Sequence, residues 1–399
     1  MIAQARAAER PRPGELRLHA VFWNSLGAGS LANALMELLD NMPGDAVERH
    51  LWCLRQHPEP AVRRDYHCPV FPELLYRAFC KARVPAAVQG RIGSSAMLNA
   101  TRPGDIVYVW PDFDLSFIKR AQDRGAIVVA ERTNVMAPMG REALARAYAR
   151  RGLSLPAGWF DPREMDQERL QMLQCDFVVA RNAFVSQSLR DVGIPDSRII
   201  EGPYGYSPKR LASAIGIERP ERPPVFAFVG GGIIGKGLDV LLEAWDKAGV
   251  TGTLLLAGQL DSELQASYSH ILARPDVSVL GFVRDVASVY AAADVFVFPS
   301  HVEGGPQVVY EAAGCGLPSI ISPMGAGHLV RHEAEGLLID PLEVDQLAGA
   351  IATLAEDQAL RRKMGAAAAE RAHDFTWAKV GRHLYKQFTR VITLQGRQS

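Results

Sequence analysis

The chain lacks several features that would assign it to a protein class at once. Its five cysteines are an odd number without a C-x-x-C pair, which argues against a disulfide framework and against a zinc site. Forty-four basic and 44 acidic residues give a formal charge of zero, so the balance does not indicate bulk binding of nucleic acid. No apolar run reaches the ~18 residues of a membrane span, and the first residues lack the apolar core of a secretion signal. We expect a cytoplasmic protein without a bound metal, and leave open a peripheral contact with the inner membrane face.

A regular alternation of apolar and amphipathic segments is present instead. The 399 residues, 48% of them hydrophobic, are enough for two domains. Short apolar runs such as Ile106–Trp110 and Val225–Val229 alternate with longer segments of helical periodicity, and this pattern is typical of βαβ units with a parallel sheet. The sequence therefore predicts an α/β protein with two doubly wound halves.

A change of composition separates these halves. Residues 202–224 are rich in proline, glycine and charge and have no sustained apolar period. After the second half, one long helix carries Trp377, Val380, Leu384 and Phe388 on one face, which must be buried. We expect this helix to cross back to the first half. The predicted parts are a flexible tail (1–14), a first domain (15–205), a linker (206–224), a second domain (225–375) and a crossing helix with its tail (376–399).

The segment 293–318 combines a buried strand, a glycine-containing loop and a helix start. Val295–Phe298 is a short apolar run between chain breakers, and Pro306 suits the first position of a helix. Glu303 precedes this helix, and Glu311 lies about 7–8 Å into it. With the positive end of the helix dipole between them, the carboxylates suit a ligand with sugar, diphosphate and ribose in line. The alternative is a solvated loop charge and a surface helix residue.

Residues 230–237, GGGIIGKG, follow a strand and match two phosphate-binding patterns. The dinucleotide fingerprint needs an acid after the next strand, where residues 257–259 are Ala-Gly-Gln. The P-loop needs a hydroxyl group at the position of Gly237. Backbone N–H groups and Lys236 at a helix start remain, and they can hold a phosphate. A structural turn with a solvated Lys236 is the alternative.

Four segments carry a family resemblance: FVGGGIIGKGLDVLLEAW, LGFVRDVASVYAAADVFVFPS, EGGPQVVYEAAGCGLPSIIS and FTW. Together, over about 225–388, they resemble the donor-binding domain of the retaining nucleotide-sugar glycosyltransferases of family 4. The spacing of Glu303 and Glu311 matches the family's E-x7-E signature. The first half, with SLGAGSLANAL and RIIEGPYGYS, resembles the acceptor-side domain more weakly. The resemblance implies a GT-B fold, in which two Rossmann-like domains face each other across a cleft, catalysis without metal, and retention at the anomeric carbon.

The resemblance also implies roles for particular residues. Glu303 would bind the hydroxyl groups of the donor sugar, Glu311 those of the ribose, and Lys236 the diphosphate. Glu303 and Lys236 are the residues we expect to act in catalysis. Further expected donor contacts are Gly27, Gly29, Gly231, Phe282, Val283, Gly304, Gly305, Gln307 and Val308, with Phe282 and Val283 against the base and the two early glycines approaching the phosphate from the first domain.

Two departures from the family pattern concern the charge and the proton chemistry of this site. Gly231 stands where many members have an arginine, so Lys236 would carry the diphosphate contact alone. In the first domain many members have a histidine near the sugar, whereas here the strand runs into Ala130-Glu131-Arg132-Thr133-Asn134. We assign Arg132 and Asn134 to the acceptor side, with a capping or loop role as the alternative.

The resemblance predicts a hexosyltransferase that moves a sugar from a nucleotide-diphosphate sugar, with UDP or GDP as the first choices, to a glycan or lipid-linked acceptor. Such a reaction would serve the biosynthesis of a polysaccharide or glycoconjugate and needs no further cofactor. A non-catalytic nucleotide-sugar binding protein is the alternative. Two segments could face the acceptor or a membrane, with a solvated surface as the alternative for both: the basic segment with Arg141, Arg146, Arg150 and Arg151, and the amphipathic segment 74–83.

Overall fold

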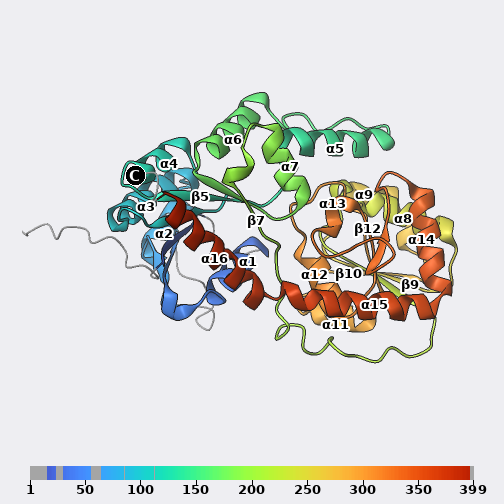
Figure 1. Ribbon diagram of the computed structural model, residues 1–399. Coiled ribbons are helices and arrows are strands. Elements are labelled where there is room, and N and C mark those ends of the chain that lie inside the picture. Colours follow the sequence, from blue (N-terminus) through green and yellow to red (C-terminus); the bar gives the residue numbers. More distant parts are fainter. Residues whose placement is uncertain (1–15, 24–29, 55–63, 85, 112, 396–399) are drawn as a thin grey trace, which may run out of the picture.

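The computed structural model describes residues 16–23, 30–54, 64–84, 86–111 and 113–395. The predicted tail, residues 1–14, lies outside these ranges. The described residues form two parallel sheets, each with helices packed on its faces, and Figure 1 shows the two halves side by side. The predicted α/β class with two doubly wound halves is confirmed.

The first sheet has seven strands in the order β3-β2-β1-β4-β5-β6-β7, and all its pairs are parallel. Its central strands β4 and β6 are buried along their whole length, which explains their continuous apolar sequences. The strands are β1 (Leu16–Phe22), β2 (Val47–Cys53), β3 (His67–Pro69), β4 (Ile106–Val109), β5 (Ile127–Arg132), β6 (Phe177–Ala180) and β7 (Ile199–Glu201).

Helices cover both faces of this sheet, and several begin at side chains that accept hydrogen bonds from the first turn. Asp114 caps α4 and Asn182 caps α7 in this way. The helices are α1 (Ser30–Asp40), α2 (Glu73–Lys81), α3 (Ala86–Ala100), α4 (Leu115–Gln122), α5 (Ala137–Arg150), α6 (Pro162–Gln174) and α7 (Ala183–Asp191), with 3-10 turns η1 (Gly44–Ala46) and η3 (Asp196–Arg198).

The second sheet has six strands in the order β10-β9-β8-β11-β12-β13, again all parallel. They are β8 (Val225–Val229), β9 (Thr253–Ala257), β10 (Val277–Gly281), β11 (Val295–Phe298), β12 (Ser319–Ile321) and β13 (Gly336–Leu338). The helices of this half are α8 (Leu238–Ala248), α9 (Ser262–Ser267), α10 (Ser269–Leu272), α11 (Val286–Ala292), α12 (Gln307–Gly314), α13 (Pro323–Ala326), α14 (Val344–Glu356) and α15 (Gln358–Ala372), with 3-10 turns η4 (Ile234–Lys236) and η5 (His373–Phe375).

The last helix, α16 (Trp377–Gln395), crosses back to the first half as predicted (Figure 1). The ring of Phe388 lies 5.3 Å from that of Tyr108 on β4, and Leu384 is buried. At Gly381 the helix approaches α1 so closely that a Cβ atom would lie 2.6 Å from the carbonyl oxygen of Asn41. The second half is therefore joined to the first by packed helices as well as by the linker.

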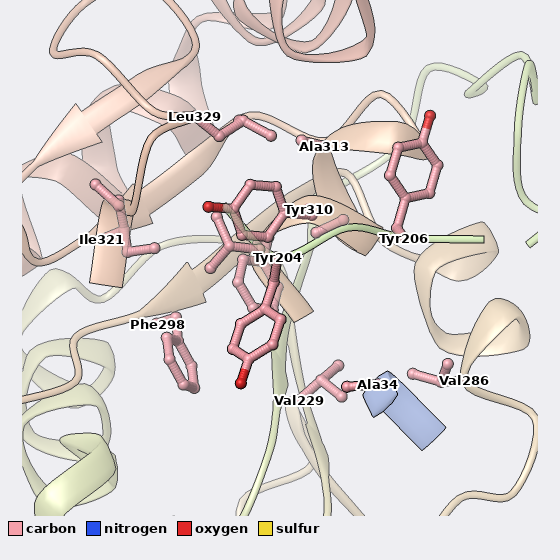
Figure 2. Close-up of a cluster of buried hydrophobic side chains, with 14 of the residues drawn as sticks. Ala34, Tyr204, Tyr206, Val229, Val286, Phe298, Tyr310, Ala313, Ile321 and Leu329 are labelled. Atoms are coloured by element: carbon pink, nitrogen blue, oxygen red, sulfur yellow. The ribbon is translucent and has the colours of Figure 1, made fainter. Parts of the chain in front are cut away.

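The hydrophobic core is continuous across this junction. Tyr204 and Tyr206, which follow β7, belong to the same cluster as Tyr310 and Phe298 of the second half, and Figure 2 shows these side chains together. The backbone of Tyr206 exchanges hydrogen bonds with Phe375 and Trp377. The segment after β7 is thus packed between the two halves.

Candidate functional site

The candidate site lies where the strand order of the second sheet reverses. β8 and β11 are neighbours, with β9 and β10 continuing on one side and β12 and β13 on the other. Ligands of open α/β sheets bind at the carboxyl ends of the strands at such a switch point. The turn η4 follows β8, and the loop with Glu303 follows β11, so the two segments singled out in the sequence meet here.

Lys236 and Glu303 form an ion pair at this position. The Nζ atom of Lys236 contacts Oε1 of Glu303, and the Oγ atom of Ser300 donates a 2.8 Å hydrogen bond to the same oxygen. Glu303 is buried, whereas Lys236 is partly exposed and lies 5.8 Å from the centre of the Phe298 ring. The pair places a cation for phosphate and a carboxylate for hydroxyl groups side by side.

The turn that holds Lys236 ends at Gly237, and this glycine corrects one expectation. The sequence predicted a helix starting at Lys236, but the structure has a 3-10 turn there and the helix α8 starts at Leu238. Gly237 has a left-handed backbone (φ 71°), and a Cβ atom there would lie 2.1 Å from the carbonyl oxygen of Pro299. The close approach fixes the Lys236 turn against the end of β11.

The helix after Glu303 starts at Gln307, with Pro306 as its N-cap residue. Pro306 makes no side-chain capping hydrogen bond, and the first turn of the helix contains no acidic residue. Glu303 lies beside it in the preceding loop. A helix N-terminus of this kind favours an anion through its first N–H groups and its dipole.

Glu311 lies further along α12 and is almost completely buried. Its Oε2 atom accepts a 3.0 Å hydrogen bond from Tyr290, and its Oε1 atom lies 3.3 Å from a guanidinium nitrogen of Arg210. Burial raises the pKa of Glu311, and the charge of Arg210 opposes that shift. Because both glutamates are buried and bonded, the interpretation of them as solvated surface charges is wrong.

The loop with Glu303 also touches the first half of the chain. A Cβ atom at Gly304 would lie 2.0 Å from the carbonyl oxygen of Thr133, and one at Gly305 would lie 2.8 Å from the Tyr204 ring. Gly305 has a φ of 152°, which favours glycine. The two glycines therefore allow the loop to approach the other half closely.

The remaining residues that we expected to contact the donor differ in how far they are exposed. Gly231 is exposed, with open space around its Cα atom. Phe282 follows β10 and is 74% exposed, and Val283 is half-buried. Val308 lies in the first turn of α12 and is half-buried. The predicted contacts Gly27 and Gly29 fall outside the described residues.

Arg132 and Asn134 mainly order their own loop. Arg132 pairs with Glu168 at 2.6 Å and donates hydrogen bonds to the carbonyl oxygens of Asn134 and Val135. Burial lowers the pKa of Arg132, opposed by the charge of Glu168. The side chain of Asn134 is exposed, and its Oδ1 atom accepts a hydrogen bond from the next backbone N–H. These contacts fit the alternative loop role, and an acceptor-side role stays a prediction.

The basic segment on α5 is turned partly toward the second half. Arg150 lies 2.5 Å from Asp239 and 2.6 Å from Glu243, both on α8. Arg151 donates a hydrogen bond to Ser267. Arg141 and Arg146 are exposed. Arg150 and Arg151 are therefore contacts between the halves, which corrects the expectation that all four arginines face an acceptor or a solvated surface.

The sequence did not single out a buried pair next to the site, Glu131 and Arg181. Both are fully buried and joined at 2.5 Å. The sequence feature that could have indicated them is the position of each charge: Glu131 continues the apolar run of β5, and Arg181 directly follows the apolar run of β6. His301, two residues before Glu303, was also not singled out, although it is only 5% exposed.

Within the part of the chain that the structure describes, no group of three or more His, Cys, Asp or Glu side chains could hold a metal ion. Among the same residues, no helix has the length and apolarity needed to cross a bilayer. The five cysteines have free thiols.

A family model matches most of the second half of the chain. Residues 213–371 match the family model described as glycosyl transferases group 1. The chain is 32% identical over 105 residues to an Escherichia coli protein named UDP-Gal:alpha-D-GlcNAc-diphosphoundecaprenol alpha-1,3-galactosyltransferase, covering 26% of this chain and 27% of that one. It is 26% identical over 309 residues to the D-inositol 3-phosphate glycosyltransferase of Nocardia farcinica, covering 71% and 66%. The match spans about a quarter of the length of the first curated relatives.

Solved structures match nearly the whole chain. Sucrose-phosphate synthase from Thermosynechococcus elongatus has a TM-score of 0.73 at 17% identity, covering 95% of this chain and all of that one. Anabaena HepE in complex with UDP and glucose has a TM-score of 0.66 at 15% identity, covering 94% and 100%. The chain thus has the GT-B fold, and its residues 213–371 match the family model of group 1 glycosyl transferases.

Proposed function

We propose that the chain is a hexosyltransferase that takes a sugar from a nucleotide-diphosphate sugar and retains its anomeric configuration. The observation that carries this proposal is the pair of Lys236 and Glu303 beside the start of α12, with Glu311 buried further along the same helix. Cation, helix dipole and two carboxylates match a diphosphate between two hydroxyl-bearing sugars.

The comparisons support a UDP or GDP sugar as the donor. HepE was solved with UDP and glucose, and also with UDP-glucose. A relative from Corynebacterium glutamicum, 28% identical over 234 residues, is named a GDP-mannose-dependent alpha-mannosyltransferase. We propose the same class of donor here, with Lys236 and the backbone N–H groups of Gln307 and Val308 on the diphosphate.

The mechanism we propose places attack on the face from which the diphosphate leaves. Glu303 binds hydroxyl groups of the sugar and Glu311 those of the ribose, so neither carboxylate serves as a nucleophile. Lys236 and the positive end of α12 stabilise the charge that develops on the leaving diphosphate. Arg132 and Asn134 lie on the opposite half and would contact the acceptor.

We propose a glycan or lipid-linked acceptor in polysaccharide or glycoconjugate biosynthesis, and a cytoplasmic protein in peripheral contact with the inner membrane face. On α2, Leu74 is 82% and Leu75 43% exposed, with Lys81 and Arg83 exposed at the end of the same segment. Apolar side chains bordered by cations suit a surface of anionic lipids. Co-sedimentation with anionic vesicles tests this contact: the wild type should bind and Leu74→Asp should not, and failure of the wild type to bind would exclude it.

A non-catalytic nucleotide-sugar binding protein is the second candidate, favoured by one observation. Gly231 leaves open space where the family commonly has an arginine, so the glycine-rich turn offers the diphosphate one cationic side chain, Lys236, instead of two. Release of nucleoside diphosphate from the bound donor separates the candidates, since a binding protein leaves its ligand intact.

The two glutamates provide the test of the donor site. Glu303→Gln should lower turnover of the nucleotide sugar while the affinity for the free nucleoside diphosphate stays the same, because Glu303 binds the sugar. Glu311→Gln should weaken binding of the nucleoside diphosphate itself. Calorimetric titration with UDP and GDP, together with turnover of UDP and GDP sugars, measures both effects. Equal nucleotide affinity of the wild type and Glu311→Gln would exclude the ribose role.

Retention has its own test. Proton NMR of the product formed from an α-linked donor should show an α-linkage, whereas a β-linked product would contradict retention.

A further inference from the structure

A buried polar network of the first half lies directly under the loop that carries Glu303. Its centre is Arg181, which follows β6 and has no exposed side-chain surface. The guanidinium donates to both oxygens of Glu131, at 2.5 and 2.7 Å, and to the Tyr108 hydroxyl at 2.9 Å. It also donates to the carbonyl oxygens of Pro203 and Gly202, at 3.1 and 3.4 Å. Arg181 therefore uses all five of its N–H groups within the protein.

Tyr204 completes this network and covers it. Its hydroxyl donates a 3.0 Å hydrogen bond to Glu131, and its ring lies over the Arg181 guanidinium at 4.6 Å. Because every donor of Arg181 is engaged, the arginine has no N–H left for a ligand. A buried ion pair adds little net stability, since the desolvation of both charges offsets their attraction. The network is more readily explained by the positions it fixes than by stability.

The position it fixes is that of the Glu303–Gly305 loop. A Cβ atom at Gly305 would lie 2.8 Å from the Tyr204 ring and 3.0 Å from Cβ of Arg181, so this loop rests on both residues. The next residue, Asn182, places its amide nitrogen 3.4 Å from the carbonyl oxygens of Glu303 and Met324. The Glu303–Gly305 loop of the second half thus packs against residues 181, 182 and 204 of the first half.

We infer that Arg181, held by Glu131 and covered by Tyr204, is a positioning residue for the donor-sugar carboxylate Glu303. This inference rests on the proposed function and extends it. The sugar end of the donor site reaches its working geometry only when the first half supports the loop. The nucleotide end of the donor site does not depend on this support. Glu311 is held there by Tyr290 and Arg210, which do not belong to the network around Arg181. Turnover of the donor sugar therefore depends, through Arg181, on the contact between the two halves.

Arg181→Met tests this inference, with Arg190→Met as the control, because Arg190 is a partly exposed ion-pair residue on the following helix. Amide hydrogen exchange in a peptide covering residues 300–310 should become roughly tenfold faster in Arg181→Met only. The kcat for the nucleotide sugar should fall by roughly tenfold to a hundredfold, since a displaced contact costs this much. The Kd of UDP or GDP should stay within about twofold of the wild type.

A second variant keeps the test valid if Arg181→Met does not fold. Tyr204→Leu removes the ring that covers Arg181 and lies against Gly305, and it should show the same separation of kcat from nucleotide Kd. Unchanged exchange in residues 300–310 would overturn the inference. A parallel loss of kcat and nucleotide affinity would also overturn it, because it would indicate a general structural role. A lower melting temperature by itself is expected, since Arg181→Met leaves the buried Glu131 without its partner. If the wild type neither binds nor uses a nucleotide sugar, the proposed function fails, and hydrogen exchange alone decides whether Arg181 positions the loop.

Discussion

Glu303 and Glu311 lie on either side of one helix start, and their partners differ in a way that fits different roles. Glu303 has a partly exposed cation, Lys236, and a hydroxyl donor, Ser300, at one of its oxygens. Glu311 is held by a phenol and a more distant arginine in buried surroundings that raise its pKa. A partner such as Lys236 can turn toward a bound diphosphate, which leaves Glu303 to accept hydrogen bonds from a sugar.

Replacement of Lys236 by alanine should lower kcat for the nucleotide sugar at least tenfold. The loss of one preorganised charge contact to a developing anion costs about 2.7–4 kcal/mol in the transition state. Lys247→Ala is the matched control, since Lys247 is an exposed lysine on α8, paired with Asp345. Steady-state kinetics measures both variants, and unchanged turnover in Lys236→Ala with an unaltered melting temperature would contradict the assignment.

His301 should make the stability of the protein depend on acid pH. Burial, helped by the nearby charge of Arg150, lowers the pKa of His301 from 6.5 to about 4. Below pH 6.5 the unfolded chain takes up a proton that the folded chain takes up only near pH 4, so stability falls as the pH falls through this range. At pH 5 the loss relative to pH 7.5 is about 2 kcal/mol.

The measurement is urea unfolding at pH 7.5 and 5 for the wild type and His301→Gln. The variant should lose about 2 kcal/mol less than the wild type between these two pH values, while all other histidines contribute equally to both. An identical pH dependence in the two proteins would show that His301 titrates normally.

At the scale of elements, strands with continuous apolar runs were predictable, and the two strands β2 and β3 at one side of the first sheet were not. Val295–Phe298 and Val225–Val229 were predicted with the bounds that the structure has, because both are buried on two faces. The strand β2, with the sequence VERHLWC, mixes charged and apolar residues, and its neighbour β3, the edge strand, has only three residues. Neither gives a periodic signal strong enough to be recognised.

The candidate site was predictable to the extent that its residues lie in short motifs. Lys236 and Glu303 were identified from local patterns, and the structure brings them into contact. The network of Tyr108, Glu131, Arg181 and Tyr204 could not be predicted, because its members come from β4, β5 and the ends of β6 and β7. Only the tertiary packing shows that these buried polar groups satisfy one another.

Gly304→Ala adds only one methyl group but should displace the loop that carries Glu303. The new methyl group would lie 2.0 Å from the carbonyl oxygen of Thr133, so either the loop or the residues around Thr133 must move. We expect turnover to fall roughly a hundredfold, as a displacement of about 1 Å can cost this much. Gly349→Ala, on α14 with open space around it, is the control and should leave turnover unchanged. Wild-type turnover in Gly304→Ala would show that the contact with Thr133 is not needed.

At the scale of the whole molecule, several contacts among the described residues hold the two halves together. They include the Glu303–Gly305 loop on Arg181 and Asn182, the packed segment around Tyr204 and Tyr206, the crossing helix α16, and the contact of α5 with α8. Arg150 is central to the last of these, because Asp239 has no exposed side-chain surface and receives its charge partner from the other half. Burial raises the pKa of Asp239, and Arg150 opposes that shift.

Arg150→Met should therefore destabilise the protein by about 3–5 kcal/mol, since it leaves a buried carboxylate without its partner. The double variant Arg150→Met with Asp239→Asn should recover most of this loss. Arg146→Met, an exposed position on the same helix, is the control. Urea unfolding measures all three, and a loss below about 1 kcal/mol in Arg150→Met would show that solvent compensates for the missing partner.

The most direct test of the central claim is release of nucleoside diphosphate from a panel of UDP, GDP and ADP sugars. With one of these donors at 100 times its Kd, the wild type should be stabilised by about 2.7 kcal/mol and should release the nucleoside diphosphate above the uncatalysed rate. Glu303→Gln should bind the same nucleoside diphosphate and release it from the sugar much more slowly. A wild type that is stabilised by none of these donors and releases no nucleoside diphosphate would contradict the assignment of Lys236, Glu303 and the start of α12 as a donor site.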